Sequence, residues 1–255
     1  MSVAARRFGR RLGNKLYKAA FPIYRPLYSV FKSYTDRTER RLIARHISPG
    51  SVVVDAGANI GIYSQFLARC VGPTGTVHSF EPSPENFARL RAAIASLPNV
   101  RVNQLALSDK TGDSLLYVSE ELNVDHRAYP TEGEARRTLS IRSARLDDYF
   151  KSGERVDLIK MDIQGYECHA LRGAKRVLQE NPEIKLLLEF WPFGMKQAGI
   201  PWEELIEMLR YFGMDLVLVK REGLIPFDAA DVRIDSSWYV NIFAGRELGD
   251  RAVSR

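Results

Sequence analysis

Short apolar runs rich in β-branched residues alternate along most of this chain with segments of helical periodicity, and this alternation constrains the fold most. Such a pattern is typical of βαβ units, in which helices join successive parallel strands. Because residues 221–237 have the composition of a loop, we expect the last strand to run antiparallel. The sequence therefore predicts an α/β fold with a doubly wound, mostly parallel, Rossmann-like sheet of seven strands. The strands are expected at residues 52–55, 76–80, 100–107, 156–161, 184–190, 214–220 and 238–243.

An insertion at about residues 111–150 interrupts this alternation between the third and fourth strands. It contains two strand-like runs, "SLLYV" and "RTLSIRSARL", so we expect a hairpin or lid over one end of the sheet. Residues 1–34 are expected to form a basic helical arm, and residues 247–255 a C-terminal tail. The main domain is then predicted to span residues 35–246.

Basic residues are concentrated near the N-terminus. Residues 1–46 contain twelve Lys or Arg and two acidic residues, whereas the rest of the chain carries a net charge of −4. From residue 8 to residue 23, apolar residues recur every three or four positions, which fits an amphipathic helix on an anionic lipid surface. A helix packed on the domain with its charges in water fits equally well, and Pro22 and Pro26 are expected to end the helix early. Peripheral membrane contact through residues 1–30 is therefore one of two alternatives.

Composition also bears on location. No apolar run approaches the length needed to span a bilayer, and the arginine-rich start lacks the apolar core of a secretory signal. Cys70 and Cys168 have no nearby cysteine or suitably spaced histidine, which favours a reducing compartment. We expect a cytoplasmic protein, with the membrane alternative placing it at the inner face of the membrane. The oligomeric state is left open.

The loop "DAGANIG" after the first strand indicates a ligand site, because ligands of such sheets bind beyond the carboxyl ends of the strands. It lacks the G-x-G-x-x-G pattern of dinucleotide sites, with Asn59 where a glycine would stand. Asp55 would repel a pyrophosphate but can hold an ammonium group, and Glu81 closes the next strand, where an acid can bind ribose hydroxyls. A cationic ligand with a ribose and no phosphate, S-adenosylmethionine, fits both acids. The structural alternatives are a helix cap for Asp55 and a surface carboxylate for Glu81.

Six motifs in this order resemble those of the FkbM-type S-adenosylmethionine-dependent methyltransferases: "VVVDAGANIGIYS", "VHSFEPSPENFARL", "NQLALSD", "ARLDDYF", "DLIKMDIQGYECHALRGAKRVL" and "LLLEFWP". The resemblance covers roughly residues 40–190. It implies a class I methyltransferase fold and O-methylation of a hydroxyl on a sugar, glycolipid or natural product. Many relatives carry glutamate where this chain has Gln164, so no negative charge is available there.

Together, the motifs and their spacing single out a set of cofactor-binding residues. The expected cofactor-binding residues are Asp55, Ala56, Gly57, Asn59, Gly61, Glu81, Pro82, Ser83, Ala106, Ser108, Asp162 and Gln164.

The acceptor side is predicted less directly. A hydroxyl nucleophile benefits from a nearby base, and the catalytic candidates are His126, Asp162 and Asp125. Arg127, Tyr129, Glu189 and Trp191 are the candidate acceptor-binding residues. No metal ligand is predicted, although Asp162 could hold Mg²⁺ together with other oxygens.

Other functions remain as alternatives. A catalytically inactive, membrane-associated binding protein could keep the same fold, with the basic arm as its working part. A nucleic-acid methyltransferase steered by that arm is less favoured, because no D/N-P-P-Y/F/W signature is present. A nicotinamide oxidoreductase ranks last, since the glycine pattern does not match.

Overall fold

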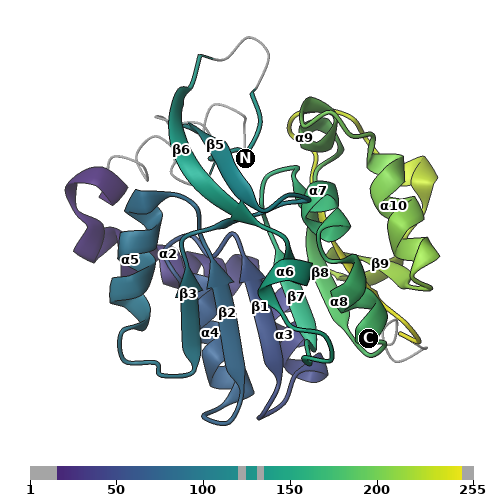
Figure 1. Ribbon diagram of the computed structural model, residues 1–255, viewed down its shortest axis with the longest axis horizontal. Helices are drawn as coiled ribbons and strands as arrows, with labels where there is room; N and C mark the ends of the chain where they lie inside the picture. Colours follow the sequence, from purple (N-terminus) through teal and green to yellow (C-terminus); the bar gives the residue numbers. More distant parts are fainter. Residues whose placement is uncertain (1–15, 120–124, 131–134, 249–255) are drawn as a thin grey trace.

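The computed structural model describes residues 16–119, 125–130 and 135–248 of the chain. Its centre is an eight-stranded sheet in the order β10-β9-β11-β8-β7-β1-β2-β3, seen in Figure 1. The strands of this sheet are β1 (Val52–Ala56), β2 (Thr76–Phe80), β3 (Val100–Asn103), β7 (Leu158–Met161), β8 (Lys185–Phe190), β9 (Asp215–Lys220), β10 (Gly223–Pro226) and β11 (Val240–Gly245).

The strand pairing confirms the predicted mostly parallel sheet with an antiparallel last strand. The five strands from β3 to β8 pair in parallel, and β11 runs antiparallel to both of its neighbours, β8 and β9. The predicted count of seven strands was one too low, because part of the expected loop forms β10 in a tight hairpin with β9. The run at residues 100–107 is also not one strand, since the chain leaves the main sheet after Asn103.

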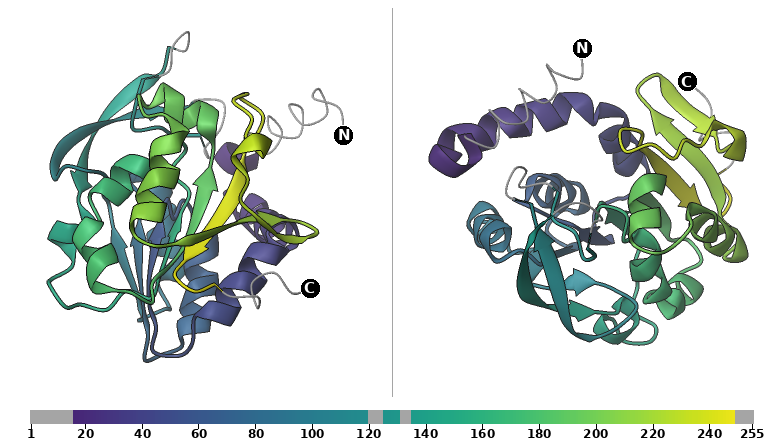
Figure 2. Two further views of the ribbon diagram at one scale, coloured as in Figure 1. Left: turned by 90° about the vertical axis from the view of Figure 1, so that its right-hand side faces the viewer. Right: turned by 90° about the horizontal axis from the view of Figure 1, so that it is seen from above.

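Helices cover both faces of this sheet, as Figures 1 and 2 show. One face packs its apolar side chains against α3, α4 and α5, and the other packs against α6, α7, α8 and α10. The connection from β7 to β8 contains two short helices, α7 and α8. The helices are α2 (Phe21–Thr35), α3 (Arg37–His46), α4 (Ile62–Val71), α5 (Pro84–Ile94), α6 (Leu146–Tyr149), α7 (Glu167–Arg172), α8 (Lys175–Glu180), α9 (Pro192–Gln197), α10 (Trp202–Tyr211) and the 3₁₀ turn η1 (Ala229–Asp231).

The insertion forms a second sheet. Its two predicted strands, β5 (Gly112–Val118) and β6 (Arg137–Ala144), pair antiparallel, and β4 (Ala106–Leu107) joins β6 to complete three strands. Figure 1 shows this sheet beyond the carboxyl ends of the main strands. That it acts as a lid stays a prediction.

The N-terminal helices differ in part from the sequence prediction. Helical residues 16–19 end before Ala20, and α2 starts at Phe21 with Pro22 in its first turn, so the chain does break next to Pro22. Pro26, however, lies inside α2 and does not end the helix as expected. Both prolines are exposed, and the carbonyl group that Pro26 leaves without a donor can bond to water. Tyr17 and Tyr24 are buried with Ile60 and Ile62, so residues 16–34 pack on the domain.

Two parts of the predicted organisation lie outside the described residues: positions 1–15 of the arm and positions 249–255 of the tail. Among the described residues, no helix combines the length and apolarity needed to cross a bilayer.

Candidate active site

Four carboxyl groups meet at the carboxyl edge of the main sheet. Asp55 belongs to β1, Glu81 follows β2, Asp162 follows β7, and Glu189 stands near the end of β8. The four strands are neighbours in the order β8-β7-β1-β2. Parallel pairing brings their carboxyl ends together, and this is the edge at which doubly wound sheets bind ligands.

Asp55 is fully buried beneath this edge. It accepts a hydrogen bond from the Ser64 hydroxyl at 2.7 Å, and its other oxygen lies 3.6 Å from Lys160 Nζ. That oxygen has no hydrogen-bond partner among the described residues. Burial raises the pKa of Asp55, with Lys160 opposing the shift. The cation predicted to pair with Asp55 is thus supplied within the chain by Lys160.

The loop after β1 is tight because of its glycines. Gly57 has a φ of +76°, and a Cβ there would lie 2.0 Å from the carbonyl oxygen of Asp162. A Cβ at Gly61, where φ is +83°, would lie 2.9 Å from Leu90. Each position therefore needs glycine for two reasons: a Cβ would clash with the protein's own atoms, and the backbone is in the left-handed region. Asn59 also has a positive φ of 50°, a conformation that asparagine adopts more readily than most residues.

This loop is bonded to Glu81. The Glu81 carboxyl group accepts hydrogen bonds from the backbone N–H groups of Asn59 at 2.8 Å and Ser83 at 2.9 Å. Ser83 is also the N-cap residue of α5. Pro82 precedes it, and Pro84 is in the first turn of the helix. Burial raises the pKa of Glu81 to about 7, although the two backbone hydrogen bonds oppose the shift. Glu81 is thereby held firmly next to the loop that the sequence assigns to the cofactor.

Ala106 and Ser108 lie elsewhere than expected. Ala106 belongs to β4 of the second sheet. The Ser108 N–H donates to the carbonyl oxygen of Ala144, the last residue of β6. A Cβ at Gly173 would lie 2.0 Å from the Ser108 carbonyl oxygen, so Ser108 packs against the end of α7. Their assignment to the cofactor's adenine stays a prediction.

Asp162 and Glu189 form a bridged acid pair. The Gln164 amide Nε2 donates to Asp162 Oδ1 at 3.0 Å and to Glu189 Oε2 at 2.9 Å. Burial opposes the ionisation of Asp162, but Lys160 and Lys32 outweigh it and lower the Asp162 pKa. Burial and the neighbouring Asp162 and Glu167 carboxyl groups raise the Glu189 pKa well above its ordinary range. Of the two carboxyl groups, Glu189 therefore holds a proton more strongly than Asp162.

The loop that carries Gln164 is strained. Gln164 has a φ of 58° and Gly165 a φ of 92°, and a Cβ at Gly165 would lie 2.5 Å from the backbone of Gly194. The Tyr129 hydroxyl donates to the carbonyl oxygen of Gln164. Left-handed backbone at a non-glycine residue persists where the surroundings over-determine it. Tyr129, predicted to bind an acceptor, is buried here and positions the Gln164 loop.

The sequence prediction missed Lys32, Lys160 and Tyr28. Lys160 stands within the buried strand β7, 3.9 Å from Asp162 as well as 3.6 Å from Asp55. Lys32 reaches in from α2, and Tyr28, Asp36 and Asp162 raise its pKa although burial opposes this. A lysine inside an apolar strand is a rare signal that could have identified Lys160. Nothing in the sequence links α2 to this edge.

The remaining predicted residues of the insertion form a separate network. The Arg127 guanidinium contacts Asp125 at 2.8 Å and lies 5.0 Å from the Trp191 ring centre, and Arg136 contacts the second Asp125 oxygen. The backbone N–H of Ser119 donates to His126 Nδ1 at 3.2 Å, and burial lowers the His126 pKa. Neutral His126 then carries its proton on Nε2, which leaves no ring lone pair for proton removal.

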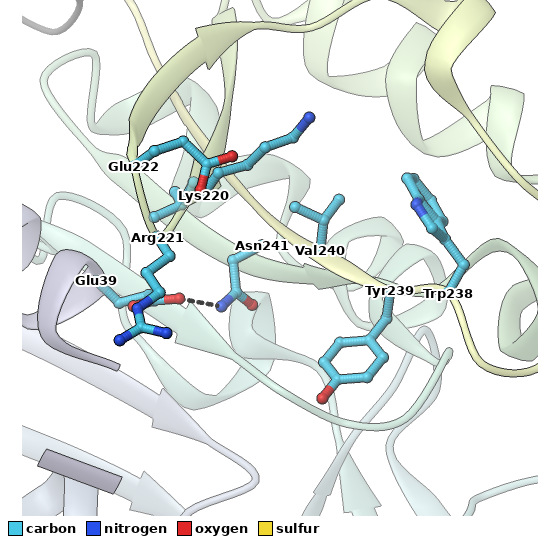
Figure 3. Close-up of a pocket in the computed structure, with 9 residues that line it drawn as sticks. Glu39, Lys220, Arg221, Glu222, Trp238, Tyr239, Val240 and Asn241 are labelled. Carbon is cyan, nitrogen blue, oxygen red and sulfur yellow. Dashed lines mark hydrogen bonds between the residues drawn. The ribbon is translucent and has the colours of Figure 1, made fainter. Parts of the chain in front are cut away.

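An open pocket of about 360 Å³ lies at the same edge of the sheet, between α3, the β9–β10 hairpin and the start of β11. Figure 3 shows charged side chains at one end and two aromatic rings at the other, with the Asn241 amide donating to Glu39. Asn241 stands directly opposite Glu189 in the β8–β11 register, so the two side chains project from the same face. The lining residues are Glu39, Val219, Lys220, Arg221, Glu222, Trp238, Tyr239, Val240 and Asn241.

Comparison with known families agrees with this geometry. The family model described as the methyltransferase FkbM domain matches residues 55–216, which contain all four acids. The chain belongs to the FkbM methyltransferase family. It is therefore an S-adenosylmethionine-dependent methyltransferase, as the resemblance implied.

Relatives within the FkbM family cover different shares of the chain. The chain is 24% identical over 193 residues to a 2-O-methyltransferase, NoeI, of Sinorhizobium fredii, a match covering 69% of this chain and 78% of that one. It is 47% identical over 171 residues to the 31-O-demethyl-FK506 methyltransferase FkbM of Streptomyces tacrolimicus, covering 53% and 65%. It is 29% identical over 144 residues to the hexuronic acid methyltransferase AglP of Haloferax volcanii, covering 54% and 56%.

The site of this FkbM-family protein fits its cofactor. S-adenosylmethionine carries a sulfonium and an ammonium group, and the acidic edge contains an ionised Asp162 whose side chain is partly exposed. Glu81 lies beside the glycine loop, and its binding of the ribose hydroxyls stays a prediction. In the described segments, no group of three or more His, Cys, Asp or Glu side chains is arranged to hold a metal ion.

Glu167 should make the stability of this FkbM-family protein fall with rising pH. Its side chain is fully buried, and burial raises its pKa from 4.5 to about 8, with backbone hydrogen bonds opposing the shift. Between these values the unfolded chain releases the proton and the folded protein keeps it, so unfolding becomes easier as pH rises. Glu167→Gln should reduce this slope by about 1.4 kcal/mol per pH unit.

Urea unfolding at pH values across this window measures the slope. The control is Glu183→Gln, since Glu183 is exposed and its variant should keep the slope of the wild type. Equal slopes for Glu167→Gln and the wild type would show that Glu167 titrates normally in the folded protein.

Proposed function

We propose that this protein transfers the methyl group of S-adenosylmethionine to a hydroxyl oxygen of a sugar, glycolipid or natural-product acceptor. The observation that carries the proposal is Asp162. It is an ionised carboxylate with a side chain 38% exposed, held between Lys160 and Gln164 at the ligand-binding edge. Two relatives have names that support oxygen as the acceptor atom: the 2-O-methyltransferase NoeI and the 31-O-demethyl-FK506 methyltransferase FkbM.

Asp162 is the residue to receive the proton of the acceptor hydroxyl. S-adenosylmethionine, when bound, supplies a methyl group on an already activated sulfonium, so orientation and a positioned base are what the protein must add. As the methyl group passes from the sulfonium sulfur to the acceptor oxygen, the sulfur–methyl bond would break, S-adenosylhomocysteine would leave, and the hydroxyl proton would pass to Asp162. Gln164 holds one Asp162 oxygen at 3.0 Å, and the other lies 3.9 Å from Lys160 Nζ, beyond hydrogen-bond distance, so it can still accept the hydroxyl proton.

The other two catalytic candidates fit this role less well. Two guanidinium groups, of Arg127 and Arg136, neutralise Asp125. His126 Nδ1 accepts from Ser119, so His126 can donate a hydrogen bond to an acceptor but not remove its proton. Asp162 also lies near two cations, Lys160 and Lys32, but neither is within hydrogen-bond distance of it in the way that both arginines are of Asp125, and its side chain is 38% exposed against 18% for Asp125.

The pocket beside Glu189 is the proposed acceptor site. Its aromatic rings, Trp238 and Tyr239, can stack on the apolar face of a sugar or a macrocycle, while Asn241 and Glu39 offer polar atoms to hydroxyl groups. An acceptor there would present a hydroxyl toward the acid pair.

A methyl-transfer screen tests the function. Wild-type protein and labelled S-adenosylmethionine are incubated with glycolipid, polysaccharide, natural-product and nucleic-acid pools, with Asp162→Asn as the blank. We expect label in a hydroxyl-bearing compound, in a methyl ether that survives mild alkali. Label in nucleic acid, label released by alkali as from a methyl ester, or no label in any pool would each overturn the proposal.

A further inference from the structure

Helix α2 presents an apolar stripe to solvent. Five large apolar side chains along the helix are 59–71% exposed, and their spacing of four, three, one and three residues places them on one side. Single exposed apolar residues are common, but a contiguous row of this size marks an interaction surface. The stripe consists of Ile23, Leu27, Val30, Phe31 and Tyr34.

The opposite side of α2 fixes the helix in this orientation. Tyr24 is buried with Tyr17 in a small core, and their rings meet edge to face at 5.5 Å. Further along the helix, Lys32 pairs with Asp36 at 2.5 Å and lies 5.8 Å from the Tyr63 ring centre. Turning the stripe inward would break these contacts, so the stripe stays outward in the folded protein.

The exposed charges on the N-terminal helices, which include the helix of the stripe, are all positive. Among residues 16–46, the exposed charged side chains are Lys18, Arg37, Arg41 and Arg45. The last three recur every four residues along α3 and form a basic ridge. The acids of the same region are engaged elsewhere, Asp36 with Lys32 and Glu39 with Asn241. The preceding residues 1–15 add five basic residues and no acid to the sequence.

An apolar stripe beside positive charge has one partner that fits both features. We propose that α2 and the basic ridge of α3 bind the surface of an anionic lipid bilayer, with the stripe at the boundary between headgroups and acyl chains. A second copy of this chain is a poorer occupant, because the same face of two molecules would bring two strongly basic segments together.

Binding in this way would set the active site at the lipid surface. The stripe and the residues Tyr28 and Lys32 lie on different sides of one helix, and Lys32 acts on Asp162 electrostatically. An amphiphilic acceptor held in the same bilayer would then reach the acid pair without leaving the membrane. The binding itself depends only on the stripe and the ridge, so it can be tested without an acceptor.

Vesicle co-sedimentation of the full chain tests the proposal. We expect binding to phosphatidylcholine vesicles that contain phosphatidylglycerol and little binding to phosphatidylcholine alone. The double variant Leu27→Ser/Phe31→Ser should weaken binding about tenfold or more. The triple variant Arg37→Gln/Arg41→Gln/Arg45→Gln should weaken it similarly and reduce its dependence on salt. Tyr211→Ser is the matched control, since Tyr211 is 79% exposed on α10 and should not affect binding.

Three results would overturn the proposal. The first is that the wild type does not bind anionic vesicles. The second is that Leu27→Ser/Phe31→Ser and the Tyr211→Ser control lose vesicle binding to the same extent. The third is that the wild type self-associates and Leu27→Ser/Phe31→Ser is a monomer. Circular dichroism confirms folding of each variant, and the arginine variant decides the outcome if the stripe variant does not fold.

Discussion

Asp162→Asn should lower kcat by about a hundredfold or more while the protein stays folded, because a positioned base contributes roughly that factor. Asparagine has nearly the same shape and can still accept the hydrogen bond from Gln164, which is 3.0 Å long in the wild type. It cannot take a proton. Steady-state kinetics with the acceptor found in the screen measures the loss, and calorimetry with S-adenosylhomocysteine measures cofactor binding separately.

Two comparison variants separate chemistry from binding in that experiment. Asp113→Asn removes a carboxylate on β5 whose side chain is 94% exposed, and it should keep wild-type kinetics. Tyr239→Ala, in the proposed acceptor pocket, should raise the acceptor KM more than it lowers kcat. An Asp162→Asn variant with wild-type kcat would remove Asp162 from the mechanism, and a Tyr239→Ala variant with unchanged KM would remove the pocket.

Gly57→Ala should destabilise the protein by about 3 kcal/mol or more and abolish cofactor binding. The added Cβ would lie 2.0 Å from the carbonyl oxygen of Asp162, and the residue must also keep a φ of +76°. To relieve this clash, the loop after β1 and the end of β7 must move apart. That movement separates the loop from Asp162, so one methyl group should affect both stability and ligand binding. Urea unfolding and calorimetry measure the two effects.

Gly153→Ala is the matched control for this substitution. Gly153 has a φ of +78°, and a Cβ there would meet nothing within 4 Å among the described residues. It therefore carries the strain of the left-handed backbone without the clash, and should cost about 1 kcal/mol. If both variants lose the same stability, the contact between Gly57 and Asp162 has no energetic importance.

The predicted strands and helices agree with the structure where local pattern decides them. The apolar runs that begin at Val52, Thr76 and Ile184 form strands close to their predicted positions, because a strand buried on both faces needs a continuous apolar run. The pattern failed for β10, whose side chains are only partly buried. It also failed at Pro26, where a helix continues through a proline because its packing on Tyr17 and the domain outweighs a local penalty.

Within the candidate site, the sequence alone located the residues that follow strand ends. Asp55, Glu81 and Asp162 were predicted there, and the structure places all three at one edge of the sheet. It could not predict that Lys160 would pair with Asp55, that Gln164 would bridge Asp162 and Glu189, or that Asn241 would stand beside Glu189. These contacts join segments far apart in the chain.

The sequence by itself therefore determined the parallel α/β architecture, the FkbM family and the cofactor, because strand periodicity and motif spacing are local properties of the chain. Only the tertiary structure decided which acid stays ionised, since the pKa of Asp162 depends on Lys160 and on Lys32 from α2. It also decided that α2 turns five apolar side chains outward. Charge state and exposure are set by what each side chain meets in three dimensions, and that depends on the packing of the whole chain.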